Sequence, residues 1–196
     1  MVMKKQQVIV KTYYPFILGL ILLLPGCTQM SELESDPTAG SNGGFEISRN
    51  GAPVNWSLYT PKTVPNAIFE IVLDTVVFKE GERSLKFDVK ECSSNGGWHS
   101  PGLMNEFFEV GKYKGEATYE LSFWIKNSGS KFSISAGGVA PNKGEMITLI
   151  ENDEQIDEWR HLEFNIDVPE DRWLRMQVNI LEPGIFWIDD VRIEQI

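Results

Sequence analysis

Residues 173–180 read Trp-Leu-Arg-Met-Gln-Val-Asn-Ile, with an apolar side chain at every second position. Successive side chains of a β-strand point to opposite faces of a sheet, so this spacing makes one face apolar and leaves the other polar. A strand with one buried and one solvated face is typical of antiparallel sheets. The solvated face would present four side chains able to contact a ligand, namely Trp173, Arg175, Gln177 and Asn179.

The same two-residue period recurs along the rest of the chain, at 85–90, 119–126, 132–136 and 162–167. Residues that favour turns separate these segments, at 79–82, 94–97, 127–130 and 141–144. No window of eleven or more residues has a clear helical period. We therefore predict an all-β fold, an antiparallel β-sandwich of the jelly-roll type.

The N-terminus has the pattern of an export signal. Three lysines and no acid stand in residues 1–11, and an apolar run follows at 13–24. This run has about twelve residues, whereas a membrane-spanning helix needs about twenty. The segment is therefore interpreted as the core of a signal peptide and is excluded from the fold.

The apolar run ends in Leu24-Pro25-Gly26-Cys27, which resembles the lipobox of bacterial lipoproteins. The resemblance implies a signal peptide of residues 1–26, cleavage before Cys27 and diacylglycerol on the Cys27 sulfur. Two or three acyl chains anchor a protein stably, whereas one chain binds only marginally. The alternative is an ordinary secretory signal that happens to end near a cysteine.

Residues 27–44 are interpreted as the lipidated cysteine and a flexible tether, because they are polar, acidic and rich in turn residues. Residues 45–196 then form a single domain. The acids of the tether loosely resemble the surface-export signals of Bacteroidetes-type lipoproteins. We therefore expect an outer membrane lipoprotein, at the cell surface or otherwise facing the periplasm.

The exported chain is acidic. Removal of the leader takes away three lysines and no acid, which changes the formal net charge from −10 to −13. This charge argues against nucleic acid and anionic lipid surfaces as partners, so membrane attachment is expected through the lipid alone. Besides Cys27 only Cys92 remains, so the exported chain has no pair of free cysteines for an internal disulfide. We expect a monomer.

Several landmarks resemble one known family. The domain opens with Asn42-Gly43-Gly44-Phe45-Glu46 and closes with Ile188-Asp189-Asp190-Val191, with the strand 119–126 between them. In this order and spacing they resemble the jelly-roll carbohydrate-binding modules of xylanases and cellulases, within the galactose-binding-like fold. The resemblance covers residues 42–196. It implies binding of a poly- or oligosaccharide without catalysis.

The resemblance also implies a structural calcium that ties the first strand to the last, since calcium prefers oxygen ligands. Its carboxylate candidates are Glu46, Asp189 and, as an alternate, Asp190. Alternation from Val191 and Ile193 would place Asp189 on the core side, where a carboxylate needs a partner or a metal. Alternatively, Asp189 caps a turn or pairs with Arg83 or Arg192.

A sugar site combines an aromatic platform for the C–H face of the ring with planar hydrogen-bonding groups. The row that begins at Trp173 offers both. Trp124 stands on the polar side of its own strand and would join this face if the two strands share a sheet. Alternatively, a loop or the core of a neighbouring strand covers Trp124.

A second candidate site is the loop 93–101, where Trp98 and His99 stand between two strands. Loop tips carry binding residues in many folds. Alternatively, Trp98 folds back as a lid over the core. The sequence leaves the sheet face and the loop open as sites.

Catalytic motifs are missing from the sequence. It contains two histidines, no Gly-x-Ser-x-Gly elbow, no His-Glu-x-x-His and no phosphate-binding glycine loop. The acids of 151–154 lack the spacing of β-sandwich glucanases, and we interpret them as a solvated turn. Three functions remain: glycan binding without catalysis, a structural or adhesion lipoprotein that binds proteins, and a small glycan hydrolase or lyase.

Overall fold

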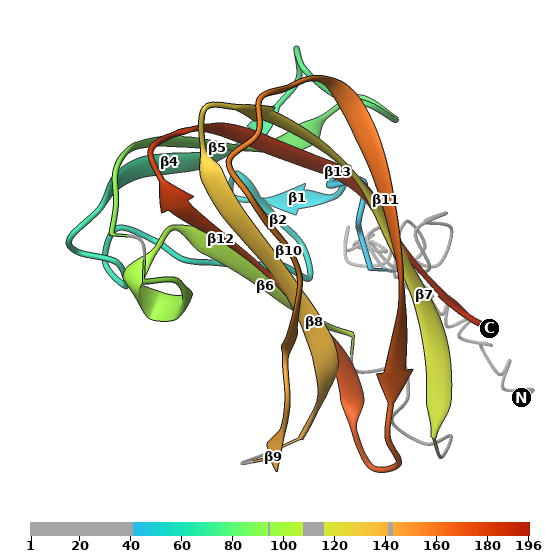
Figure 1. The fold of residues 1–196 in the computed structure, drawn as a ribbon. Helices are drawn as coiled ribbons and strands as arrows, with labels where there is room; N and C mark the ends of the chain where they lie inside the picture. The colour runs from blue at the N-terminus through green and yellow to red at the C-terminus, as the bar shows by residue number, and fades with distance from the viewer. Residues whose placement is uncertain (1–40, 94, 108–115, 141–142) are drawn as a thin grey trace, which may run out of the picture.

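The computed structural model describes residues 41–93, 95–107, 116–140 and 143–196. The predicted signal peptide, the lipidation site Cys27 and most of the predicted tether lie outside these residues. Figure 1 shows the fold, whose elements in chain order are β1 (Ser48–Arg49), β2 (Ala52–Pro53), β3 (Ser57–Leu58), β4 (Ile68–Asp74), β5 (Ser84–Glu91), η1 (Gly97–His99), β6 (Gly102–Phe107), β7 (Ala117–Ser128), β8 (Lys131–Ala140), β9 (Lys143–Gly144), β10 (Ile147–Asn152), β11 (Ile156–Val168), β12 (Trp173–Glu182) and β13 (Gly184–Gln195).

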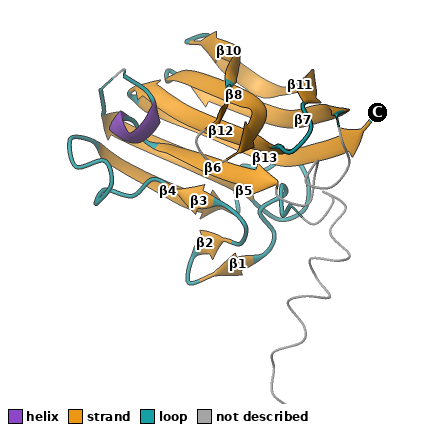
Figure 2. Ribbon diagram, turned by 90° about the horizontal axis from the view of Figure 1, so that it is seen from below, coloured by secondary structure: helices purple, strands orange, loops and turns teal. Residues whose placement is uncertain are grey.

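Two antiparallel sheets pack face to face (Figure 2). The six-stranded sheet has the order β10-β8-β12-β6-β3, with β9 paired to β8, and the five-stranded sheet has the order β11-β7-β13-β5-β4. The short pair β1 and β2 forms a separate ribbon. This arrangement confirms the predicted all-β sandwich. Within the described residues, no helix has the length and apolarity needed to span a membrane.

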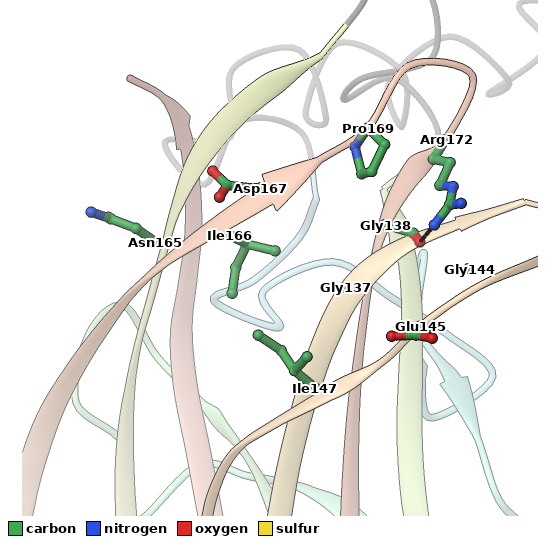
Figure 3. A pocket seen from close by; sticks show the side chains of 10 residues that line it. All are labelled: Gly137, Gly138, Gly144, Glu145, Ile147, Asn165, Ile166, Asp167, Pro169 and Arg172. Atoms are coloured by element: carbon green, nitrogen blue, oxygen red, sulfur yellow. Dashed lines mark hydrogen bonds between the residues drawn. The ribbon is translucent and has the colours of Figure 1, made fainter.

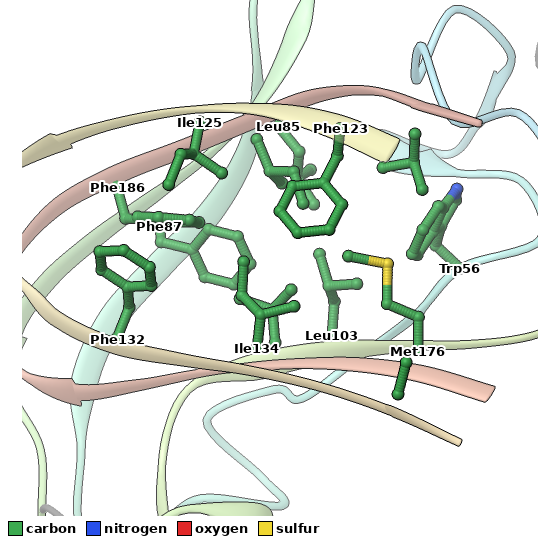
Figure 4. Packing of buried hydrophobic residues seen from close by; sticks show 14 of the residues in the cluster. Trp56, Leu85, Phe87, Leu103, Phe123, Ile125, Phe132, Ile134, Met176 and Phe186 are labelled. Atoms are coloured by element: carbon green, nitrogen blue, oxygen red, sulfur yellow. The ribbon is translucent and has the colours of Figure 1, made fainter. Parts of the chain in front are cut away.

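The core lies between the two sheets and is built from the apolar face of each strand (Figure 4). Phe132 of the six-stranded sheet contacts Phe186 of the five-stranded sheet, with ring centroids 4.6 Å apart. Phe87 meets the same Phe186 edge-on at 5.9 Å. Aromatic side chains bury a large apolar area each, so this trio joins the two layers.

The opening and closing motifs of the domain contact each other. The Asn42 side chain donates to the carbonyls of Ile47 and Val54, at 2.8 Å each, and its amide oxygen accepts from the Ile47 N–H. The next residue, Gly43, accepts a hydrogen bond from the Val191 N–H of β13 at 3.1 Å. The Asn-Gly pair therefore ties the start of the domain to its last strand.

The last strand contains a bulge that overturns one expectation. The pairing of β13 with β7 shifts between Asp189 and Arg192, and Asp190 has a left-handed backbone with φ 49°. Asp189 pairs with Trp124, so its side chain lies on the outer face of the sheet. Alternation had placed Asp189 on the core side, and that prediction is wrong because the extra residue reverses the alternation.

Candidate functional site

The outer face of the six-stranded sheet carries the row predicted from residues 173–180. The alternate apolar side chains of β12 are completely buried, as predicted: Leu174, Met176, Val178 and Ile180. On the outer face, Trp173, Arg175 and Gln177 are half-buried. Asn179 continues the row but is only 6% exposed. The strand therefore offers an aromatic ring, a guanidinium and an amide in line to a ligand.

Neighbouring strands place small polar side chains beside this row. Ser135 and Ser133 of β8 stand across from Gln177 and Asn179. On the other side, β6 places Met104 next to Gln177. The row is therefore flanked by small residues on its β8 side and by larger residues on its β6 side.

Tyr59, which sequence reasoning left unplaced, belongs to this face. A Cβ built on Gly102 would lie 3.1 Å from the Tyr59 ring and 3.2 Å from the Asn179 side-chain oxygen. Gly102 therefore lets the Tyr59 ring and the Asn179 amide approach each other over β6. Asn179 also accepts a hydrogen bond of 3.1 Å from Gln177. The amide row and the tyrosine thus form one polar cluster.

Burial and the charge of Arg175 both affect the Tyr59 hydroxyl in this cluster. Burial raises the pKa of the Tyr59 hydroxyl, and the nearby Arg175 guanidinium opposes this rise. A hydroxyl with a raised pKa keeps its proton at neutral pH and can donate as well as accept. Arg175 brings N–H donors in a planar fork. Arg175 and Gln177 are half-exposed and can hydrogen-bond to neighbouring hydroxyls of a sugar, whereas Tyr59 and Asn179 are buried beside them.

Trp124 does not join this face. It lies on β7 in the five-stranded sheet, whereas Trp173 lies on β12 in the other sheet, so the expectation that both tryptophans share one face is wrong. His161 packs against the Trp124 ring at 4.7 Å, and the Lys79 ammonium lies 4.4 Å from the ring centroid. The chain's own cation therefore occupies a position over this ring.

A cavity of about 350 Å³ lies beside Trp124 on the same outer face. Its lining is mainly charged, and consists of Glu80, Glu120, Ser122, Trp124, His161, Asp190, Arg192 and Glu194. Asp190 and Arg192 pair across 2.8 Å. The remaining charged lining residues, Glu80, Glu120 and Glu194, are all acidic.

The loop with Trp98 and His99 adjoins the far end of the β12 row. His99 is exposed on the short helix η1, whereas the side chain of Trp98 lies outside the described part of the structure. The carbonyl of Pro101 accepts a hydrogen bond of 2.8 Å from the Ile180 N–H. The loop and the sheet face, expected as separate alternatives, therefore lie next to each other along β12.

The three carboxylates proposed as calcium ligands lie near the turn at residues 79–83. One oxygen of Glu46 accepts hydrogen bonds from the Glu82 and Arg83 N–H groups, at 2.8 and 3.1 Å. One oxygen of Asp189 accepts from the Lys79 and Glu80 N–H groups, also at 2.8 and 3.1 Å. Glu46 and Asp189 thus hold the turn against the sandwich.

These contacts test how well the residues fit calcium. The second oxygen of Asp189 accepts from the Asp190 N–H at 2.7 Å, and Asp190 itself accepts from Arg192. A calcium shell needs carboxylate and carbonyl oxygens around a common centre. Among the described residues, no group of three or more acidic, histidine or cysteine side chains is arranged in this way. Backbone N–H groups therefore already occupy oxygen atoms of Glu46 and Asp189 that a calcium ion would need.

Burial of Asp189 leads to a prediction about stability and pH. The side chain is fully buried. Burial raises its pKa from 3.8 to about 7, although three backbone N–H donors favour the ionised form. Between about pH 4 and pH 7 the folded state therefore holds a proton that the unfolded state has lost. We expect the free energy of unfolding to fall as the pH rises through this window, by up to about 4 kcal/mol.

Urea unfolding at several pH values, with a chelator present, measures this effect. Asp189→Asn should flatten the fall between about pH 4 and pH 7, because an amide does not titrate there. Asp153→Asn, at an exposed aspartate, is the matched control and should leave the profile unchanged. A profile that Asp189→Asn leaves unchanged would contradict the assignment.

A further cavity of about 470 Å³ opens where the edges of the two sheets come together (Figure 3). Ile147 of β10 and Ile166 of β11 point toward its interior, and Arg172 donates to the Gly138 carbonyl at 3.5 Å. None of the described residues that line it is aromatic: Gly137, Gly138, Gly144, Glu145, Ile147, Asn165, Ile166, Asp167, Pro169 and Arg172. It lacks the flat platform that a sugar ring requires.

No protein-family model matches the chain, and no curated protein is significantly similar to it in sequence. Solved structures are similar in fold. The CBM22-1 xylan-binding domain from Paenibacillus barcinonensis Xyn10C has a TM-score of 0.56 at 11% identity, over 78% of this chain and 91% of that domain. The CBM22-2 xylan-binding domain of the same protein has a TM-score of 0.53 at 18% identity, over 75% and 95%.

Part of a chain described as an enzymatically active domain shares the fold as well. Tailspike protein 4 of bacteriophage CBA120 has a TM-score of 0.58 at 13% identity, over 80% of this chain and 21% of that one. At such identities the similarity concerns the fold, and one fold can serve several functions. The comparisons therefore confirm that the chain is a jelly-roll β-sandwich like that of carbohydrate-binding modules.

Proposed function

We propose that this chain binds a poly- or oligosaccharide, without catalysis, on the outer face of the six-stranded sheet. The observation that carries the proposal is the row on β12, in which Trp173, Arg175 and Gln177 stand half-exposed on one face. Tyr59 packs next to this row with 3% of its surface exposed and carries its one aromatic hydroxyl. An aromatic ring beside planar hydrogen-bonding groups matches the C–H face and the hydroxyl rim of a sugar.

The fold comparisons support the choice of ligand class. Two of the similar domains are described as xylan-binding, and both match over most of their own length. Xylan and xylo-oligosaccharides are therefore the first ligands to test. A wider panel of plant and host glycans follows, because the sequence identities of 11% and 18% leave the sugar open.

A binding role fits this face better than hydrolysis. Glycoside hydrolysis requires two carboxyl groups on opposite sides of the scissile bond, about 5–10 Å apart. The positions of β8 and β12 in the middle of the face are Ser133, Ser135, Trp173, Arg175, Gln177 and Asn179, and the register of β6 adds a single acidic position, Glu106, across from Arg175. Their chemistry supports recognition of the ligand.

We also propose that the chain is an outer membrane lipoprotein, anchored through a lipid on Cys27. We expect the full chain to incorporate labelled fatty acid and to remain with the membrane fraction, since two or more acyl chains anchor stably. Cys27→Ser should incorporate no label. Release of the unaltered chain without label would instead indicate an ordinary secretory signal.

A structural calcium at Glu46, Asp189 and Asp190 stays a prediction of this proposal. Binding to the folded state alone would stabilise it by about 2.7 kcal/mol at a concentration of 100 Kd, which corresponds to about 5–10 °C in Tm. Thermal melts of residues 28–196 with calcium and with chelator measure the difference, and Glu46→Gln should abolish it. Equal Tm values would show that these carboxylates accept backbone hydrogen bonds but bind no calcium.

Calorimetric titration and tryptophan fluorescence of residues 28–196, which contain both sheets and the whole core, test the proposed function. We expect a xylan or related glycan to bind and to quench or shift the fluorescence of Trp173. A folded, calcium-supplied chain that binds no glycan of the panel would contradict the proposal. That outcome would favour the structural or adhesion lipoprotein that binds proteins.

A further inference from the structure

Exposed apolar side chains gather at one edge of the five-stranded sheet. Six large apolar side chains are exposed among the described residues, and four of these lie between residues 68 and 78: Ile68, Val72, Val76 and Phe78. They belong to β4 and to the turn that follows it. Figure 2 shows β4 at the border of its sheet. Exposed apolar residues on an edge strand favour pairing with another strand.

β4 stands at the end of its sheet and is hydrogen-bonded to a strand on one side. Its only strand partner among the described residues is β5. β4 contains no proline and no lysine, the residues that commonly protect sheet edges. Seven residues of extended backbone, Ile68–Asp74, therefore present one side to an incoming strand.

The inner side of this edge offers a place for apolar side chains. A cavity of about 270 Å³ lies between β4 and the segment that follows β3. Leu58 and Pro61 line it from one side, and Phe69 and Ile71 from the other. Side chains of an added strand that point inward would enter this apolar cavity.

The outer side of the edge carries one acid, Glu70, between the exposed side chains of Ile68 and Val72. Glu70 is exposed and stands across from Asp88 of β5, and like charges directly opposite each other destabilise a sheet. Asp88 already pairs with Lys86 and Lys90, at 3.7 and 2.6 Å. No ion pair to Glu70 is formed within the part of the chain that the structure describes. A cation on the open side of β4 would provide it.

We infer that the free edge of β4 binds an extended segment of a partner protein, in which apolar residues alternate with lysine or arginine. The apolar residues enter the cavity beside Ile71, and the basic residues lie next to Glu70. A second copy of this chain fits less well, because it would bring another Glu70 and Asp74 to the same edge. This interface lies on the five-stranded sheet, and its cavity borders the glycan face at Tyr59, which lines it as well.

NMR titration of residues 28–196 with a synthetic peptide of about eight alternating valine and lysine residues tests the inference. We expect shifts of the β4 amide signals, and binding about 10-fold weaker for the matching valine–glutamate peptide. Glu70→Lys should reverse this preference while the domain stays folded. The valine–lysine peptide should not bind when the backbone amides that would donate to β4, at alternate residues, are N-methylated. Strand addition depends on these backbone hydrogen bonds.

Other results would overturn the inference. These are equal binding of both peptides, an absence of shifts in β4, or shifts confined to another surface. Concentration-dependent sedimentation that Val72→Asp abolishes would instead assign the edge to a second copy of the chain. None of these measurements involves a sugar, so they are independent of the glycan proposal.

Discussion

Trp173→Ala is expected to weaken glycan binding by about 30-fold or more, since loss of a central aromatic anchor costs about 2–4 kcal/mol in binding sites. Trp173 is half-buried, and its indole nitrogen is inaccessible to solvent. The ring is therefore held in place before a ligand arrives, so little conformational entropy is lost when a sugar stacks on it. Titration of the variant against the best glycan of the panel measures the loss.

Trp124→Ala is the matched control, because Trp124 is also a half-buried tryptophan but lies on the opposite sheet. It should leave the affinity unchanged. Thermal melts of both variants establish that each is folded. Loss of binding in Trp124→Ala together with normal binding in Trp173→Ala would place the ligand on the five-stranded sheet and contradict the proposed site.

Gly43→Ala is expected to destabilise the fold by about 3 kcal/mol or more, which lowers Tm by roughly 6–12 °C. A Cβ on Gly43 would lie 1.9 Å from the Val191 carbonyl oxygen and 2.7 Å from its carbon. Both are backbone atoms of a buried strand, so no side chain can rotate away to make room. Relief requires the hydrogen bond between Val191 and Gly43 to lengthen or break.

The adjacent glycine supplies the control. A Cβ on Gly44 would meet only the Glu46 side chain, at an ordinary 3.7 Å. Gly44→Ala should therefore change the free energy of unfolding by less than about 1 kcal/mol. Chemical unfolding of the two variants measures both values. Equal effects of the two substitutions would show that close packing against Val191 does not determine the loss in Gly43→Ala.

Local pattern was sufficient to predict β5, β7, β8, β11 and β12, whereas β4, β6 and β10 were not predicted. The side chains expected in the core of β12 are all fully buried, because a two-residue period depends only on the geometry of a single strand. The row from Trp173 to Asn179 was predicted for the same reason. Its neighbours on the face were not predicted, because Ser135 and Tyr59 arrive from strands distant in the sequence.

Three features depended on long-range structure and could not be read from the sequence. The sheet to which Trp124 belongs depends on the pairing of β7 with β11 and β13. The orientation of Asp189 depends on a single bulged residue, and nothing in Ile-Asp-Asp-Val marks Asp190 as left-handed. The place of Tyr59 beside Asn179 depends on a glycine in β6.

The contact between Gly43 and Val191 has a mechanical consequence for an anchored protein. If the chain is held at a membrane through its N-terminus and pulled by a bound polysaccharide, tension enters the sandwich at residues 41–43. There the Asn42 side chain donates hydrogen bonds to the carbonyls of Ile47 and Val54, and the Trp56 indole donates to the Asn42 carbonyl at 2.9 Å. These hydrogen bonds and the contact of Gly43 with β13 resist the force together. The strands therefore need not separate one after another from an edge of the sheet.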